Sequence, residues 1–362
     1  MKPTAQLHQL GQSLWLDNIT RGLLTSGTLK RYIDELSVTG LTSNPTIFDH
    51  AITHGTDYDI AIREKRAAAR SDEELFFDIA LEDLTTAADL FLPIHARTDG
   101  VDGWVSLEVS PKLAYDTSST VAAAKALHAR AARTNLFIKI PGTPEGLPAI
   151  EQAVFAGVPV NVTLLFSREQ YLASADAYLR GLERRLDVGQ SLAVASVASL
   201  FISRWDVAVA ERVPVEMHDL LGIAVAKQTY KAYRELIDSP RFERLANAGA
   251  RPQRLLWAST GTKDRAASDV LYLTALQAPF TINTMPEATL LDFADHGVIT
   301  DSLPADGGDA EEVLARFASA RVDVPALASQ LQKQGADAFV RSWNDLLECI
   351  AARSHQLMAA AR

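Results

Sequence analysis

Short apolar runs alternate with longer amphipathic stretches along the chain. Runs rich in apolar and β-branched residues have the composition of buried strands, and they cover residues 13–19, 39–43, 104–109, 136–140, 158–166, 192–203, 254–259 and 280–283. Between these runs, apolar residues recur at helical spacing over 28–36, 72–92, 119–133, 168–186, 206–236 and 263–276. Strands that alternate with helices predict a parallel sheet in which each strand is reached by a helical crossover.

The number of strand-like runs favours one fold of this class. Eight β/α units are the number that closes a (β/α)8 TIM barrel. The alternative is an open doubly wound sheet, which usually has a Gly-x-Gly-x-x-Gly turn after its first strand, whereas the first run here ends Leu16-Asp17-Asn18. No low-complexity linker divides the chain, so we expect residues 1–362 to form a single barrel domain, with 325–362 as a helical C-terminal addition.

Composition and charge exclude several classes of partner. The chain of 362 residues has a formal net charge of −10 and no basic stretch, so we expect no nucleic acid and no membrane as partner. Its longest weakly polar stretch, 191–202, is too short to span a bilayer. Cys349 is the single cysteine, which fits a reducing compartment, and the N-terminus lacks the apolar core of a secretory signal. We therefore expect a cytoplasmic protein.

Polar residues collect where the apolar runs end. In a barrel of parallel strands these ends meet at one face, where the active sites of this fold are built. Residues two apart on a strand share a face, so Asn161 and Thr163 should point the same way, as should Ser106 and Glu108. The strand-end residues are Asp17, Thr42, Asn44, Glu108, Lys139, Asn161, Thr163, Ser199, Arg204, Ser259, Thr260 and Asn283.

Lys139 is the candidate nucleophile. It is the only charged residue of the apolar run 135–141. Removal from water disfavours the charged form of a lysine, and an uncharged amine attacks a carbonyl carbon to form a Schiff base. The alternative is a lysine at a strand end that reaches water or pairs with a carboxylate from elsewhere in the chain.

Two carboxylates are candidates for proton transfer near this lysine. Glu108 is flanked by apolar residues in a predicted strand, where a carboxylate needs a partner or a proton. Together with Asp17, it would supply two carboxylates in unlike surroundings, as a reaction with several proton transfers requires. Two alternatives stay open: Asp17 as a helix N-cap, and Glu108 in a salt bridge that keeps Lys139 charged.

Two cations are candidates for binding phosphate. The guanidinium of Arg204 fits phosphate oxygens, and the turn 259–263 could bind an anion through its backbone N–H groups and Lys263. Each cation, taken singly, could also be an ordinary surface residue. His50 and His54 are four residues apart, but a third ligand is not evident, so we expect no metal.

The order and spacing of these motifs resemble those of the transaldolase family, in particular its longer bacterial form. The matching segments are 13–17, 42–46, 105–109, 137–141, 160–167, 196–204, 257–260 and 283–286. The resemblance implies an enzyme of the non-oxidative pentose phosphate pathway that uses no cofactor. It would transfer a dihydroxyacetone unit from sedoheptulose 7-phosphate to glyceraldehyde 3-phosphate through a Schiff base.

The resemblance also implies roles for individual residues. Lys139 would attack the C2 carbonyl of the ketose, and Asp17 would take the proton of the C4 hydroxyl as the C3–C4 bond breaks. Glu108 and Thr163 would hold and activate a water. The implied substrate contacts are hydrogen bonds to the three-carbon unit from Asn44, Asn161 and Ser199, an aromatic ring from Phe201 and a phosphate contact from Arg204.

The chain departs from the family pattern at one position. Many relatives have an arginine two residues after the serine that corresponds to Ser259, where this chain has Gly261 and its next cation is Lys263. We therefore assign the second phosphate contact to Lys263.

Two rival functions stay open. One is an aldolase that cleaves fructose 6-phosphate to free dihydroxyacetone; relatives with that activity tend to carry Gln and Tyr at the positions of Glu108 and Phe201. The other is a sugar-phosphate-binding protein without catalysis. The sequence leaves monomer and homodimer open.

Overall fold

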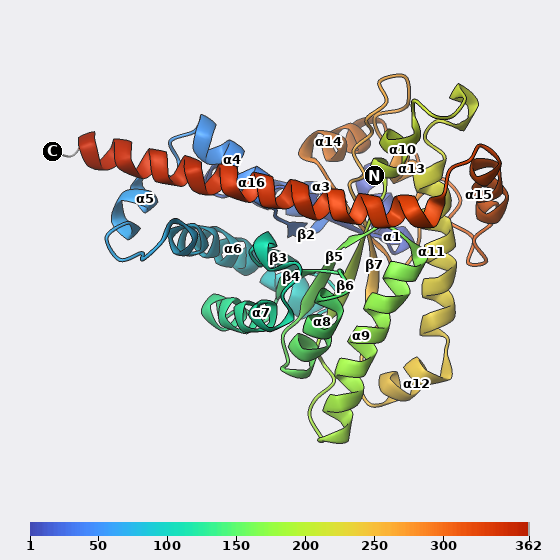
Figure 1. Ribbon diagram of the computed structural model, residues 1–362, viewed down its shortest axis with the longest axis horizontal. Helices are drawn as coiled ribbons and strands as arrows, with labels where there is room; N and C mark the ends of the chain where they lie inside the picture. The colour runs from blue at the N-terminus through green and yellow to red at the C-terminus, as the bar shows by residue number, and fades with distance from the viewer. Residues whose placement is uncertain (361–362) are drawn as a thin grey trace.

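Eight parallel strands close into a barrel in chain order, so the predicted (β/α)8 fold is confirmed (Figure 1). The computed structural model describes residues 1–360, and the last two residues of the predicted addition 325–362 lie outside the described residues. The strands are β1 (Ser13–Asp17), β2 (Val38–Thr42), β3 (Trp104–Glu108), β4 (Leu136–Pro141), β5 (Val160–Leu165), β6 (Ser196–Phe201), β7 (Arg254–Ala258) and β8 (Ile282–Met285).

Helices surround the barrel, and α16 (Val324–Ala360) crosses one of its ends (Figure 1). Within residues 1–360, none of them is both long enough and apolar enough to cross a lipid bilayer. They are α1 (Pro3–Leu10), α2 (Arg21–Thr25), α3 (Thr28–Leu36), α4 (Pro45–His54), α5 (Asp59–Lys65), α6 (Asp72–Arg97), α7 (Thr117–Ala131), α8 (Gly146–Phe155), α9 (Arg168–Asp187), α10 (Ser203–Val209), α11 (Leu221–Ile237), α12 (Pro240–Asn247), α13 (Leu271–Ala275), α14 (Glu287–His296), α15 (Ala310–Ser319) and α16 (Val324–Ala360).

Two predicted helices are wrong in extent. The stretch 206–236 forms two helices, because α10 ends at Val209 and the connection to α11 contains Pro214, which has no N–H to donate to a helix. The stretch 263–276 is helical only in α13. Its first half is a loop in which the Asp264 carboxylate and the Ser268 hydroxyl accept hydrogen bonds from nearby backbone N–H groups, and such local bonds compete with helix formation.

Aromatic side chains fill the N-terminal half of the barrel. They form an aromatic floor below the cavity at the C-terminal ends of the strands. The rings of Trp104 and Phe137 stack with centroids 4.1 Å apart, and the Trp15 ring lies 6.2 Å from Phe137. Gly40 on β2 leaves room for this cluster, because a Cβ atom there would lie 2.6 Å from the Trp15 ring. The open, polar part of the barrel is thereby confined to the C-terminal ends of the strands.

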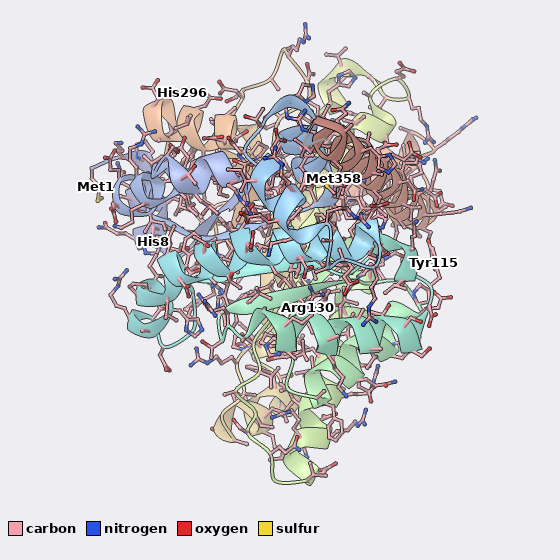
Figure 2. All side chains as sticks on the ribbon, turned by 90° about the vertical axis from the view of Figure 1, so that its left-hand side faces the viewer. Met1, His8, Tyr115, Arg130, His296 and Met358 are labelled. Carbon is pink, nitrogen blue, oxygen red and sulfur yellow. The ribbon has the colours of Figure 1, made fainter. Side chains whose placement is uncertain are left out.

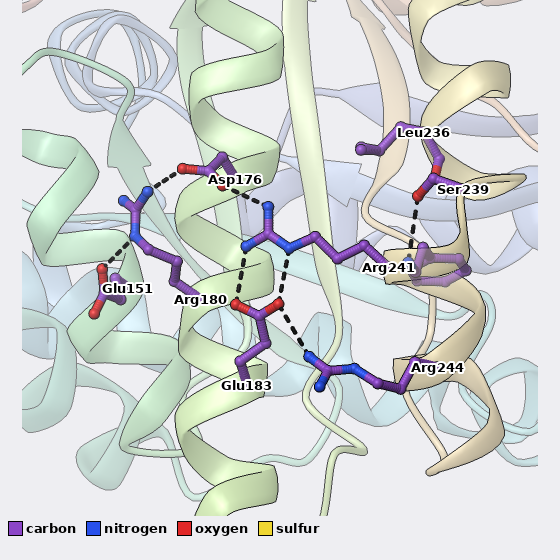
Figure 3. Close-up of polar contacts among 9 residues, drawn as sticks. Glu151, Asp176, Arg180, Glu183, Leu236, Ser239, Arg241 and Arg244 are labelled. Atoms are coloured by element: carbon purple, nitrogen blue, oxygen red, sulfur yellow. Dashed lines mark hydrogen bonds and ion pairs between the residues drawn. The ribbon is translucent and has the colours of Figure 1, made fainter.

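An ion-pair network joins three of the outer helices (Figure 3). Arg241 of α12 binds both carboxylate oxygens of Glu183 on α9 at 2.8 and 2.9 Å, and it reaches Asp176 at 2.6 Å. Arg180 of α9 continues the network to Asp176 and to Glu151 of α8 at 2.7 Å. Because these groups remain partly exposed to solvent, the network contributes modestly to stability.

The helix α16 is the longest in the fold and crosses the molecule over the ends of β3, β4 and β5 (Figure 1). Trp343 anchors it, since its buried ring packs 5.1 Å from Phe76 and 5.5 Å from Phe77 of α6. Near the far end, Arg353 forms a two-bond ion pair with Asp59 of α5 at 2.7 and 2.8 Å. Figure 2 views the molecule from that side, with Met358 on the near end of the helix.

We predict that replacing Trp343 with Ala lowers the free energy of unfolding by about 3–5 kcal/mol, because it removes a fully buried ring from the contact between α16 and α6. Urea denaturation followed by circular dichroism measures the loss. Met358→Ala on the same helix is the control; its side chain is 45% exposed, and we expect a change within about 0.5 kcal/mol. Equal losses in the two variants would contradict the anchoring role.

Candidate active site

A cavity of about 560 Å³ opens at the C-terminal ends of the strands and gathers most of the predicted site residues. A second cavity of about 890 Å³ lies at the opposite end of the barrel, below Trp104 and Phe137, and its walls are mostly apolar. The predicted residues that line the first cavity are Asp17, Asn44, Lys139, Thr163, Ser199, Phe201, Arg204, Ser259 and Lys263.

Strand register places Glu108, Lys139 and Asn161 side by side. Lys139 on β4 is the register partner of Glu108 on β3 and of Asn161 on β5. Its Nζ lies 3.4 Å from the Glu108 Oε2 and 3.4 Å from the backbone oxygen of Ser43, to which it donates. The lysine is 5% exposed and the glutamate 4% exposed, and the contact between them that the sequence left open as an alternative is present in the structure.

The Glu108 carboxyl is in a setting that favours its protonated form. Burial raises its pKa; Lys139 opposes this shift, and the negative charge of Asp17 adds to it. Within residues 1–360, neither Glu108 oxygen accepts a hydrogen bond, although Oε2 lies 3.4 Å from the Lys139 Nζ. A carboxyl of this kind can exchange a proton with a group that enters the cavity.

Asp17 faces the same cavity from the end of β1. Its Oδ1 accepts a hydrogen bond of 2.8 Å from the Thr42 hydroxyl, whose oxygen lies 2.7 Å from that of Thr284. The N-cap alternative for Asp17 is wrong, since the following helix α2 is capped by Thr20, which accepts from the Leu23 N–H at 3.0 Å. The carboxylate is oriented by one hydroxyl and otherwise open to the cavity.

The polar residues of β5 differ in whether they are already paired. The Asn161 amide donates to the Ser106 hydroxyl at 3.1 Å and accepts from the Ser199 hydroxyl at 2.8 Å. The Thr163 hydroxyl is fully buried and has no hydrogen-bond partner within residues 1–360. Next to it, the pairing register shifts and Leu164 adopts a φ of 60°, an irregularity of the kind found beside active sites. Buried hydroxyl groups need partners, so Thr163 is a candidate to bind water or a substrate hydroxyl.

Asn44 has one of its two polar atoms in use. Its Oδ1 accepts from the Ile47 N–H at 3.2 Å and so caps the helix α4. The amide nitrogen remains as a donor to a ligand in the cavity.

Arg204 is a partly buried cation with no carboxylate within 4 Å in the part of the chain that the structure describes. Its guanidinium carbon lies 5.1 Å from the centre of the Phe201 ring and 6.0 Å from that of Phe339. Burial lowers the pKa of its guanidinium. A desolvated arginine that lacks an anionic partner is suited to bind an anion from solution.

The turn after β7 forms the rim of the cavity beside Arg204. Ser259 has a φ of 55°, and its hydroxyl oxygen lies 2.8 Å from that of Ser203. Lys263 is exposed at this rim. His50 also lines the cavity, its ring stacked 4.3 Å from that of His54, and within residues 1–360 no group of three or more His, Cys, Asp or Glu is placed to hold a metal ion.

Phe339 is a cavity residue that the sequence analysis missed. It lies on α16, far along the chain from the strand-end motifs, and its ring centre is 5.8 Å from the Lys139 Nζ. No sequence signal distinguishes it, because a phenylalanine in an amphipathic helix reads as an ordinary core position.

Comparisons with known proteins find one family for this chain. The sequence model of the family described as Transaldolase/Fructose-6-phosphate aldolase matches residues 14–350. A protein named Transaldolase from Arthrobacter sp. (strain FB24) is 45% identical over 354 residues, with 95% of both chains covered. Another of that name from Thermobifida fusca (strain YX) is 46% identical, with 96% of this chain and 97% of the relative covered, and one from Mycobacterium bovis (strain BCG / Pasteur 1173P2) is 42% identical, with 95% of both covered.

The helix that carries Arg204 is held by Asp206. The buried Asp206 carboxylate accepts from the Tyr272 hydroxyl at 2.7 Å and from the Gly222 N–H at 3.1 Å, which ties α10 to α13 and α11. Burial raises the pKa of Asp206 to about 6, against the opposing effect of these two hydrogen bonds. The folded protein therefore holds a proton here more tightly than the unfolded chain does.

We predict that Asp206→Asn changes how stability depends on pH. Because the folded-state pKa is raised, the stabilisation from this group is present at low pH and is lost as pH rises through about 6. Between pH 5 and 7, the free energy of unfolding of the Asn variant should gain about 1 kcal/mol relative to the unmodified chain. Urea denaturation at both pH values tests this, with the exposed Asp301→Asn as a control expected to follow the unmodified chain. Parallel pH profiles for Asp206→Asn and the unmodified chain would contradict the prediction.

Proposed function

The chain belongs to the transaldolase/fructose-6-phosphate aldolase family, and we propose that it is a transaldolase that carries the transferred unit on Lys139. It is a transferase that acts on sugar phosphates. The reversible reaction converts sedoheptulose 7-phosphate and glyceraldehyde 3-phosphate into erythrose 4-phosphate and fructose 6-phosphate. The observation that carries the proposal is the buried Lys139 amine beside Glu108, in one cavity with the unpaired Arg204.

Formation of the Schiff base begins when the Lys139 nitrogen adds to the C2 carbonyl of the ketose. The resulting carbinolamine loses its hydroxyl as water, which requires a proton donor, and the product is a protonated imine. Glu108 is suited to give and take this proton because burial favours its protonated form. The unpaired Thr163 hydroxyl supports the proposal that Glu108 and Thr163 hold the water that leaves here and returns in hydrolysis.

Carbon–carbon cleavage follows from the imine. Asp17 takes the proton of the C4 hydroxyl, the C3–C4 bond breaks, and its electron pair moves toward the imine nitrogen to give an enamine. The aldose leaves with a new C=O group. The acceptor aldose then enters, the enamine carbon attacks its carbonyl, and Asp17 returns the proton.

The remaining residues bind the two ends of the substrate. We assign the hydrogen bonds to the three-carbon unit to the Asn44 amide, whose oxygen already caps α4, and to the joined side chains of Asn161 and Ser199. Phe201 lies beside the imine. The phosphate contacts are Arg204, the turn at Ser259 and, at the rim, Lys263, a cation two positions beyond the Gly261 that stands where many relatives have arginine.

We also propose that the chain works as a single barrel domain with 325–362 as its helical addition. The reducing setting implied by a single cysteine supports a cytoplasmic location.

Reductive trapping tests the Schiff base directly. When the protein is incubated with fructose 6-phosphate and borohydride, peptide mass spectrometry should locate one reduced dihydroxyacetone unit on Lys139. The control is Lys139→Met, which keeps an unbranched apolar side chain and should give no adduct while circular dichroism shows an intact fold. An unmodified mass, or an adduct on Lys263 in the unmodified chain, would contradict the proposal.

Asp17→Asn separates the two chemical steps. Removal of the base should slow carbon–carbon cleavage by about 10²–10⁴-fold, while formation of the trapped imine changes little. Single-turnover release of glyceraldehyde 3-phosphate measures cleavage, and the rate of borohydride-trapped adduct measures imine formation. An equal fall in both rates would show that Asp17 does not act as the cleavage base.

A further inference from the structure

One face of α16 is fitted to the ends of β4 and β5 above the cavity. Gln332, Gly335 and Phe339 are three and four residues apart and share this face. The Gln332 amide donates at 2.9 Å to the backbone oxygens of Gly142 and of Leu164, so it ties the helix to the loop after β4 and to β5.

Gly335 lets the helix come this close. A Cβ atom at this position would lie 2.9 Å from the Leu164 Cδ2 and 3.2 Å from the Arg204 Nη1. A larger residue would have to displace the Leu164 side chain or the Arg204 guanidinium, so glycine allows α16 to lie directly on both.

With α16 in this position, the Phe339 ring covers the Lys139 amine. The side chain is 9% exposed, and its ring centre is 5.8 Å from the Lys139 Nζ and 6.0 Å from the Arg204 guanidinium carbon. Both distances are within the reach of an attraction between a cation and an aromatic face. The helix itself is anchored elsewhere by Trp343 and Arg353, so its attachment does not depend on this ring.

We propose that Phe339 is a specificity-determining residue that decides whether the three-carbon unit is transferred to an aldose or released to water. This inference rests on the proposed function. The enamine on Lys139 has two fates: its nucleophilic carbon attacks an aldehyde, or it takes a proton and becomes the imine again. In the second case, addition of one water to C2 breaks the C–N bond, releases dihydroxyacetone and returns the free lysine amine.

The ring opposes the second fate and assists the first. Its apolar surface keeps water and its protons from the side of Lys139 that faces α16, so the enamine survives until an acceptor arrives. Its π-face stabilises the positive nitrogen of the imine that precedes and follows the enamine. By contact with Arg204 it also holds the guanidinium against Phe201, where the phosphate of the acceptor binds.

The test is the ratio of free dihydroxyacetone to sedoheptulose 7-phosphate formed from fructose 6-phosphate and erythrose 4-phosphate. For Phe339→Ala, we expect this ratio to rise by about tenfold or more over that of the unmodified chain. Phe339→Leu restores an apolar cover and should return the ratio to within about threefold. Met358→Ala, at the exposed end of the same helix, should leave it unchanged.

A loss of packing alone would lower both products together and leave their ratio constant, which would overturn the proposal. If Phe339→Ala does not fold, Phe339→Gln takes its place, because it keeps much of the side-chain volume but presents a polar group to the side of Lys139 that faces α16, and it should raise the same ratio. The products formed by the unmodified chain show whether the role of Phe339 or the proposed function itself is wrong. If it transfers the unit but the variants keep its ratio, only the role of Phe339 is wrong; if it forms mainly free dihydroxyacetone, or no borohydride adduct, the proposed transaldolase activity is wrong as well.

Discussion

The contact between the amine of Lys139 and the carboxyl of Glu108 is the constraint on which the rest of the site depends. Each group loses its hydration in the barrel, and each is stabilised by the other across the neighbouring strands β3 and β4. Parallel register holds them at the same level, and the aromatic floor of Trp15, Trp104 and Phe137 closes the barrel beneath them. Because the two groups are close but not tightly bonded, the amine can react with a carbonyl group and the carboxyl can exchange a proton.

The fold and the position of the site were predictable for a simple reason. Eight apolar runs separated by helical stretches determine a barrel, and barrel topology brings every strand end to one face. Asp17, Lys139 and Thr163 therefore had to meet, whatever their distance along the chain. What could not be decided from the sequence depends on side-chain distances between strands. The sequence offered the contact of Lys139 with Glu108 only as one alternative, and no pattern in it indicates that Thr163 stays unpaired.

Contacts over long sequence separations explain the other omissions. Phe339 reaches the cavity from α16, which lies on β5 with Gly335 at the contact, and that approach has no periodic pattern in the sequence. The interruption between α10 and α11 was missed because the helical pattern continues on either side of Pro214. Because of this interruption, α10 is a separate short helix. Asp206 positions it, and its Arg204 lines the cavity.

The placement of Phe339 on the last helix has a consequence for biosynthesis. All eight strands precede α16 in the chain, so a ribosome has translated the whole barrel before it reaches the segment that covers the lysine. During synthesis the N-terminal part of a chain emerges first. The strands that carry the nucleophile and the carboxyl groups thus leave the ribosome before the segment that supplies their aromatic cover.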